Sequence, residues 1–292
     1  MRTLRDSDAF GELHPAVGFL FFALVIWVSM IVSHPVILAL SLFSGIFYLS
    51  RAFPGKLWPT IRLTGPLALF GAVINPLFSH EGATILTYFP DGNPLTLESI
   101  ICGISSALTL SAAIVWFSAA RLVLTTDKFV WIFGRIAPAL SLVFSMTLRF
   151  VPRFCDRIRE SFAAESLVSG KTSGKPGTAK TAISVISGSV TWAIESSLTA
   201  ADSMKSRGYG LPGRTAYTNY SLLSRDIRML IFLGATGIFV LSGQICGGFY
   251  WRFYPTVRSV ELCAFPVFFA LAFFALSLTP VIFDILADRR WR

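Results

Sequence analysis

Long apolar runs separated by short polar segments dominate the pattern along this chain. A helix needs about 20 residues to cross the roughly 30 Å hydrocarbon core of a bilayer. Six runs reach or approach that length, and we expect each to be a membrane-spanning helix. They cover residues 16–33, 35–50, 64–79, 99–120, 229–247 and 262–286.

Composition limits the class of protein. Of the 292 residues, 54% are hydrophobic and only 14% are charged, whereas a soluble domain has roughly 25% charged residues. This polar content is too low to cover the core of a soluble domain, and the apolar content excludes intrinsic disorder. The sequence therefore predicts an all-α integral membrane protein with about six transmembrane helices.

The distribution of Lys and Arg predicts the topology. A seventh apolar run, 129–148, contains Arg135 and Pro138 and is ambiguous. If it crossed the membrane, the twelve Lys and Arg residues between 149 and 228 would lie outside, against the positive-inside rule. If it stays on the cytoplasmic side, 23 Lys and Arg lie inside and only Arg252 and Arg258 lie outside. We therefore expect a multi-pass protein of the cell membrane with both termini in the cytoplasm.

The expected spans divide the chain into three parts. Residues 1–120 form an N-terminal bundle of four spans, 121–228 a cytoplasmic module, and 229–292 a C-terminal hairpin of two spans. The module holds two long helices joined by a Gly-, Ser- and Lys-rich connector at 169–177, a composition typical of flexible linkers. The net charge of +9 then reflects cytoplasmic segments, and we expect no nucleic-acid partner.

The first module helix carries a basic stripe. Arg149, Arg153 and Arg157 follow one another at intervals of four residues and share one helix face. Pro152 lies within this stripe and should start a new helix or kink the old one. The spacing leaves two interpretations open. One is a solvated face with ion pairs such as Arg157–Glu160, and the other is a docking surface.

The second module helix covers about 181–206. Ser184 and Gly188 are small residues four positions apart, a spacing that lets two helices approach closely. Gly208 can provide a left-handed cap that ends the helix. Arg207 lies beside the helix C-terminus, where a cation is favoured, and this alone accounts for an arginine there.

The sequence contains no pattern of catalytic or metal-binding residues. The three histidines are scattered, so we expect no metal site, no enzyme activity and no cofactor in this chain. Gly170, Lys171 and Thr172 resemble the end of a phosphate-binding loop, but Glu165 stands where that loop requires glycine. Asn75, which precedes a proline, is the main polar break within a span, and it is either a packing residue or a substrate ligand.

Two motifs of the module resemble a known family. Residues 148–152 read Leu-Arg-Phe-Val-Pro before a charged helix, and the second helix ends in Ser206-Arg207-Gly208. Together with the order of the parts, they resemble the transmembrane T component of energy-coupling-factor (ECF) transporters. These are ABC-type importers of vitamins, metal ions and similar micronutrients. The resemblance covers most of the chain, about 14–286, although its specific motifs are short.

The resemblance implies which residues couple to partners. In that family, an X-Arg-Gly motif ends each of two coupling helices and inserts into a groove of one cytoplasmic ATPase subunit. The second motif here is Ser206, Arg207 and Gly208. The first is Val168, Ser169 and Gly170, in which serine replaces arginine and Lys171 follows directly. The remaining residues of the resemblance would support the coupling helix: Arg149, Pro152, Arg153 and Arg157.

The implied function is that of a non-enzymatic scaffold and energy transducer in the lipid bilayer. Its partners would be two ABC-type ATPase subunits, which carry ATP and Mg²⁺, and a small membrane S component that binds the substrate. The alternatives are a stand-alone secondary transporter or channel with its own pathway, and a membrane anchor for a soluble partner. Coupled carriers usually need ionisable groups near the bilayer midplane, and the expected spans place none there except Asp284 near the end of the last one.

The expected topology can be tested by thiol labelling in a cysteine-free background. Gly92→Cys and Gly248→Cys should react with an impermeant thiol reagent added outside the cell, because they lie in the two loops expected outside. Ser173→Cys and Thr218→Cys should react only after the cells are permeabilised. Labelling of Ser173→Cys in intact cells would contradict the assignment of 121–228 to the cytoplasm.

Overall fold

A computed structural model describes residues 9–79, 81–88, 94–168, 179–212, 220–247, 251–255, 258–259 and 264–290. The chain divides into two compact units. The first combines residues 1–128 with 220–292, and the second is 129–219. The second unit is thus shorter than the cytoplasmic module expected at 121–228.

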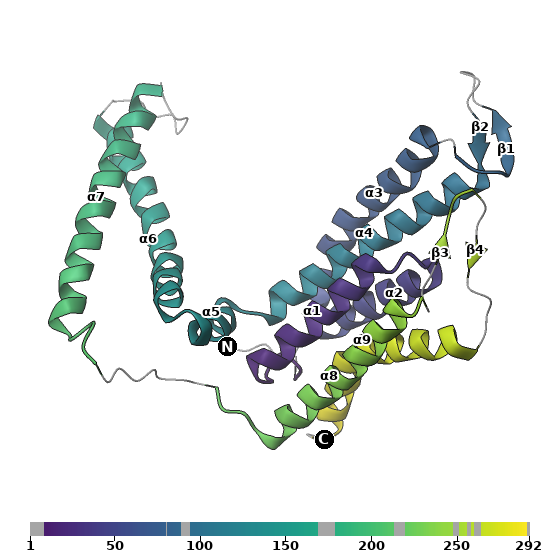
Figure 1. The fold of residues 1–292 in the computed structure, drawn as a ribbon. Coiled ribbons are helices and arrows are strands. Elements are labelled where there is room, and N and C mark those ends of the chain that lie inside the picture. Colours follow the sequence, from purple (N-terminus) through teal and green to yellow (C-terminus); the bar gives the residue numbers. More distant parts are fainter. Residues whose placement is uncertain are drawn as a thin grey trace. The chain divides into compact units, whose positions relative to one another are not determined.

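The first unit is a helical bundle. Its helices are α1 (Pro15–Ile31), α2 (Pro35–Ala52), α3 (Pro54–Phe78), α4 (Leu97–Val123), α8 (Ser224–Ile245) and α9 (Ala264–Arg290) (Figure 1). Within the described residues, five helices are long and apolar enough to cross a membrane, and α1 is an apolar helix of 17 residues. The expected fold class, an all-α membrane protein, is therefore confirmed.

The expected span at 64–79 is much too short. Helix α3 has 25 residues and begins at Pro54. Proline in the first turn is compatible with a helix because the first amides have no intrahelical acceptor. Three further prolines, Pro59, Pro66 and Pro76, lie inside α3 without ending it, so the basic residues before 64 belong to the same helix.

Short strands connect the helices at one end of the bundle. Strand β1 (Ile85–Tyr88) pairs antiparallel with β2 (Pro94–Thr96), and β3 (Trp251–Arg252) pairs with β4 (Arg258–Ser259). Glu98, in the first turn of α4, is only 2% exposed. Its carboxylate accepts hydrogen bonds from the backbone amide of Thr84 at 3.2 Å and from its hydroxyl at 2.7 Å. Glu98 therefore fixes the strand segment to α4.

The core of the bundle is built around helix α4, which packs against α1, α2 and α3. Trp116 on α4 is fully buried, and its ring meets Phe21 edge to face at a centroid distance of 5.7 Å. The indole Nε1 of Trp116 donates to the Ser41 hydroxyl at 3.0 Å, and Ser41 shares a hydrogen bond of 2.8 Å with Ser29. This chain of hydrogen bonds links α4, α2 and α1 inside an otherwise apolar core.

Helices α3 and α4 pack closely at Gly103. A Cβ added at Gly103 would lie 2.6 Å from the carbonyl oxygen of Ala72 and 3.1 Å from the Pro76 ring. Pro76 has no amide hydrogen to offer the carbonyl four residues before it, which is that of Ala72. This carbonyl therefore lacks its usual intrahelical donor, and the absence of a side chain at Gly103 lets α4 approach it closely.

Buried polar groups close the other end of the bundle. The backbone amide of Phe10 donates to the Asp284 carboxylate at 3.0 Å, and Asp226 caps the start of α8 by accepting from the Leu223 amide at 3.2 Å. His14, at the N-terminus of α1, is 5% exposed. Burial lowers the pKa of His14, and the negative charge of Asp226 opposes this change.

The second unit consists mainly of two long helices. Helix α5 (Thr126–Ile136) leads into α6 (Pro138–Val168), which packs against α7 (Ala179–Ser206). The ambiguous run 129–148 is therefore shared between α5 and α6, and neither of them is among the five long apolar helices. Helix α6 continues through Pro152, so no new helix starts there, and a kink is the remaining one of the two expected effects.

The close approach at Gly103 predicts a different cost for two equivalent substitutions. Gly103→Ala should destabilise the bundle by about 1–3 kcal/mol, because its Cβ would force α3 away from α4. Gly65→Ala makes the same change on α3 where no atom lies within 4 Å, and it should be neutral or stabilising by up to about 1 kcal/mol. Thermal unfolding of both variants in the same detergent measures the difference. Equal stability of the two would contradict the contact.

Candidate functional site

The C-terminus of α7 is closed by two backbone hydrogen bonds. The amide of Tyr209 donates to the carbonyl of Met204 at 3.0 Å, and the amide of Gly208 donates to the carbonyl of Lys205 at 3.0 Å. Gly208 has φ = 84°. These features define a Schellman cap with glycine in the left-handed position, where a Cβ would be strained. The expected role of Gly208 as the helix stop is confirmed.

The cap presents Arg207 at the end of the helix. Arg207 is exposed, and its amide is shared between the carbonyls of Ser203 and Met204 at 3.3 and 3.2 Å. Ser206 uses its hydroxyl to bond the Ser203 carbonyl at 2.9 Å, which leaves it facing its own helix. Arg207 is thus the residue of the Ser-Arg-Gly motif whose side chain can reach a partner.

Two apolar side chains lie beside Arg207 at the helix end. Tyr209 is 48% exposed and Leu211 is 68% exposed. A Cβ at Gly208 would lie 3.1 Å from Leu211, so Leu211 folds back against the cap. We call Arg207, Gly208, Tyr209 and Leu211 the α7 tip. On a capped turn it combines Arg and Tyr, two residue types that are enriched among the residues dominating protein interfaces.

The first expected motif lies at the edge of the described chain. Val168 is the last residue of α6. Ser169, Gly170 and Lys171 lie outside the described residues. The two motifs therefore fall in corresponding places, each at the C-terminus of one long helix of this unit.

The basic stripe of α6 divides into two kinds of residue. The guanidinium carbon of Arg157 lies 5.9 Å from the ring centre of Trp192 on α7, and Arg157 also lies 3.7 Å from the Glu160 carboxylate. Arg149 and Arg153 are exposed, and neither has an ion pair within the part of the chain that is described. Arg157 therefore joins α6 to α7, whereas Arg149 and Arg153 point to solvent or to a partner.

Trp192 is the main contact between the two helices. Its ring stacks on Phe150 of α6 with centroids 5.7 Å apart and an interplanar angle of 18°. Ser189 and Val185, one and two turns earlier on α7, are buried. Gly188 is exposed, with no atom within 4 Å of an added Cβ. The prediction that Ser184 and Gly188 form the close helix contact is therefore wrong, because the packing face runs through Val185, Ser189 and Trp192.

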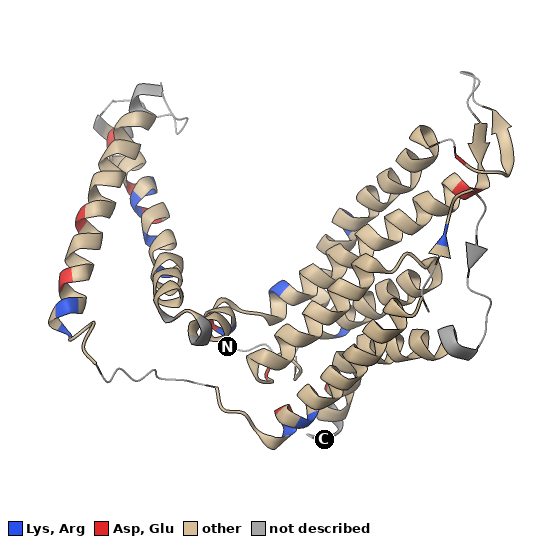
Figure 2. Ribbon diagram, viewed as in Figure 1, with Lys and Arg blue, Asp and Glu red and all other residues tan. Residues whose placement is uncertain are grey.

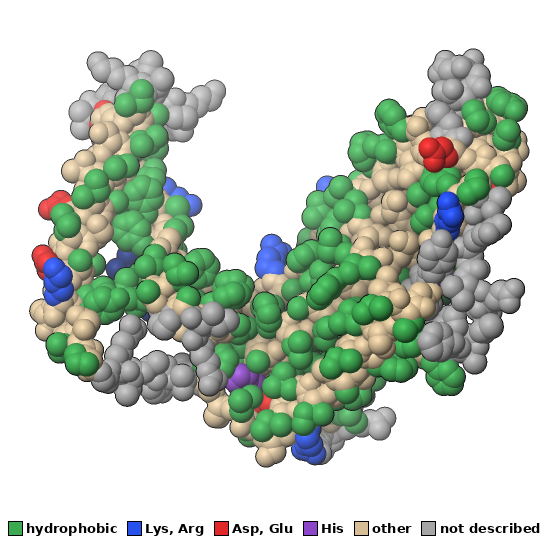
Figure 3. Space-filling view, viewed as in Figure 1, with side chains coloured by type: hydrophobic (Ala, Val, Ile, Leu, Met, Phe, Trp, Pro, Cys, Tyr) green, Lys and Arg blue, Asp and Glu red, His purple; other side chains and the backbone are tan. Residues whose placement is uncertain are grey.

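Helix α7 carries an exposed apolar stripe that the sequence analysis missed. Its members recur every three or four residues, face away from the side that packs on α6, and are 45–67% exposed. We call them the α7 apolar face: Ile183, Ile186, Val190, Ile194 and Leu198. Their spacing was the signal that could have revealed it. Figure 3 shows hydrophobic side chains along this helix.

Charge is distributed differently in the two units. In the bundle, Lys, Arg, Asp and Glu lie toward the helix ends, whereas both signs occur along α6 and α7 (Figure 2). Among the described residues, no group of three or more His, Cys, Asp or Glu side chains could hold a metal ion. The features described in this unit are an exposed arginine, a basic stripe and an apolar face.

No protein-family model matches this chain, and no curated protein matches it significantly. The structure therefore defines a class, a multi-pass all-α membrane protein with a separate helical unit. The ECF resemblance depends on the motifs quoted above.

The cap at Gly208 predicts a local and selective defect. Gly208→Ala should destabilise the α7 terminus by about 1–2 kcal/mol, because an L-residue is strained at positive φ. Amide hydrogen exchange at residues 204–209 should then accelerate about tenfold. Gly188→Ala lies on the same helix with open space around it and should leave exchange at the tip unchanged. Unaltered exchange in Gly208→Ala would show that the cap is not required to order the tip.

Proposed function

We propose that this chain is the transmembrane scaffold and energy-transducing T component of an ECF-type importer. It would link two cytoplasmic ABC-type ATPase subunits to a small membrane S component that binds a vitamin, metal ion or similar micronutrient. ATP and Mg²⁺ would be held by the ATPase subunits, and this chain would catalyse no reaction. Movement of the ATPases would be transmitted through α6 and α7 to the membrane bundle.

The observation that carries this proposal is the α7 tip. Arg207 is exposed at the end of a 28-residue helix, and its backbone is held by a Schellman cap. A guanidinium can form two parallel hydrogen bonds with a carboxylate on a partner surface. A motif held by a capped long helix transmits force better than a motif in a loop, because the helix backbone resists bending.

The α7 apolar face supports a second contact. Five apolar side chains exposed along one helix face are unusual on a solvated helix, which normally has polar residues on its outer face. An S component is itself an apolar membrane protein. We therefore assign the α7 apolar face to the S component and the α7 tip to an ATPase.

The buried carboxylates of the bundle favour this role over an independent carrier. Asp226 caps α8 and Asp284 accepts the Phe10 amide, so both carboxylates are engaged in structural contacts near helix ends. Asn75, the polar residue inside α3, lies 3.4 Å from the Cys102 sulfur and 3.4 Å from the Tyr254 hydroxyl. These contacts favour packing over substrate binding for Asn75, and with it a chain without a coupled transport site of its own.

Pull-down of the ATPase pair tests the proposal directly. Arg207→Ala should weaken ATPase binding by about tenfold to a hundredfold, because a charged hydrogen bond contributes roughly 1.5–3 kcal/mol. Ser169→Ala should weaken it less, since a neutral contact contributes roughly 0.5–1.5 kcal/mol. ATP-driven uptake of substrate should follow the same order at matched expression.

A matched charge control separates docking from a general loss of positive charge. Arg159 is exposed and pairs with Asp156 one turn earlier on α6, so Arg159→Ala should leave ATPase binding unchanged. Ile194→Asp should release the S component while retaining the ATPases. If Arg207→Ala binds the ATPases as well as the wild type does, Arg207 is only a helix-end cation and the proposed coupling is wrong.

A further inference from the structure

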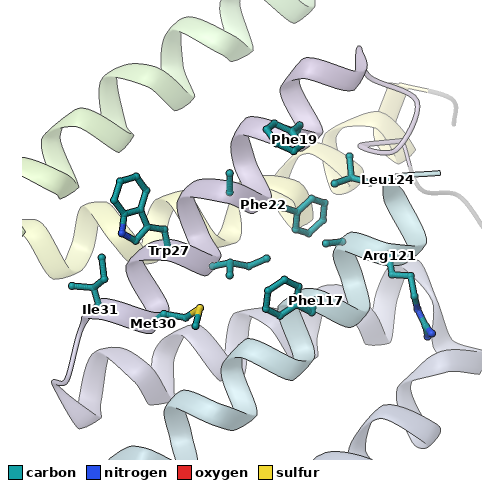
Figure 4. A pocket seen from close by; sticks show the side chains of 11 residues that line it. Phe19, Phe22, Trp27, Met30, Ile31, Phe117, Arg121 and Leu124 are labelled. Carbon is teal, nitrogen blue, oxygen red and sulfur yellow. The ribbon is translucent and has the colours of Figure 1, made fainter. Parts of the chain in front are cut away.

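A groove on the surface of the bundle lies between α1 and α4 (Figure 4). Its volume is about 710 Å³, and ten of its eleven lining residues are apolar. Ala23 and Trp27 come from α1, and Phe117 comes from α4. The eleventh lining residue is Arg121, in the last turn of α4.

The charged residue is at one end of this groove. A Cβ at Gly18, near the start of α1, would lie 3.5 Å from Leu124, which follows the end of α4. The two helices therefore run antiparallel, with Phe19 beside Arg121 and Ile31 at the far end. In Figure 4 the guanidinium of Arg121 points away from the apolar side chains. Its aliphatic stem thus lines the groove while its charge faces outward.

We propose that this groove binds one acyl chain of an anionic phospholipid, whose phosphate contacts Arg121. The inference does not depend on the proposed coupling function. The groove lies entirely within the bundle. Lipid bound there would make the stability of the bundle depend on lipid composition.

The dimensions fit a lipid chain. The lining residues of α1 extend from Phe19 to Ile31, which spans about 18 Å along a helix. One leaflet contributes about half of the roughly 30 Å hydrocarbon core. Over about 18 Å, the groove has a mean cross-section of about 40 Å², about half that of a helix 10 Å across. An acyl chain is narrow enough to lie within this cross-section, whereas a partner's helix would enter the groove only in part.

The charge selects the headgroup. Arg121 is exposed, and among the described residues no carboxylate forms an ion pair with it. A guanidinium binds phosphate with paired hydrogen bonds. Anionic lipids also create a negative surface potential, which favours a cation at this depth. A zwitterionic headgroup offers the same phosphate with a compensating cation, so the groove should prefer the anionic lipid.

Native mass spectrometry of the purified protein in detergent can test this, with phosphatidylglycerol and phosphatidylcholine of identical acyl chains as probes. The wild type should retain phosphatidylglycerol about tenfold more tightly than phosphatidylcholine. Ala23→Phe places a ring in the groove from an exposed position and should weaken both lipids about tenfold. Arg121→Gln should remove only the preference for phosphatidylglycerol.

Two control variants carry the same changes elsewhere. Ala235→Phe alters an exposed residue of α8, and Arg62→Gln alters an exposed residue of α3. Neither residue lines the groove, so both variants should bind lipid as the wild type does. Glycerol phosphate, which has the anionic group but no acyl chain, should not displace the lipid.

Three results would overturn the inference. The first is equal retention of the two lipids by the wild type. The second is that Ala23→Phe retains both lipids as tightly as the wild type does. If that variant loses a co-purifying membrane protein instead, the groove binds a protein partner and not a lipid. The third is displacement of lipid by glycerol phosphate, which would leave Arg121 as a simple anion site.

Discussion

The inability of lipid to hydrogen-bond the backbone is the constraint on which the bundle depends. Every amide and carbonyl within the hydrocarbon core needs a partner inside the protein, and helices provide it. Hydroxyl groups in the spans follow the same rule. Thr64, Ser111 and Thr279 donate to the carbonyl four residues earlier at 2.7, 2.7 and 3.1 Å. At Pro76 a helix carbonyl loses its amide donor, and Gly103 provides the space in which α4 approaches that carbonyl.

The same constraint explains where the bundle keeps its charge. Glu98, Asp226 and Asp284 are buried, but each accepts a backbone amide at a helix end or connecting segment. A buried carboxylate without such a donor would be strongly unfavourable. The unit formed by α6 and α7 differs, because it carries exposed Arg, Asp and Glu beside exposed apolar residues.

Much of the fold could be predicted from the sequence, because an apolar run long enough to cross a membrane is compatible with few structures other than a helix. The start of α3 was missed because the expected span covered only the apolar run from residue 64, whereas the helix begins at Pro54 and includes Lys56 and Arg62. The burial of Glu98 was missed because it depends on Thr84, which only the paired strands bring close. At the site, the cap at Gly208 was predictable from local chemistry. The packing face of α7 was not, because stacking of Trp192 on Phe150 overrides the preference for small residues.

Arg121 and Arg207 are the same residue type, and their different surroundings are the basis of the two roles proposed for them. Each lies at a helix C-terminus, where the carbonyl dipoles favour a cation, so sequence position alone gives the same explanation for both. Their neighbours differ. Arg207 precedes a rigid cap that exposes Tyr209 and Leu211, which suits a protein surface with its own carboxylates. Arg121 closes a narrow apolar groove on a membrane bundle, which suits a phosphate attached to an acyl chain.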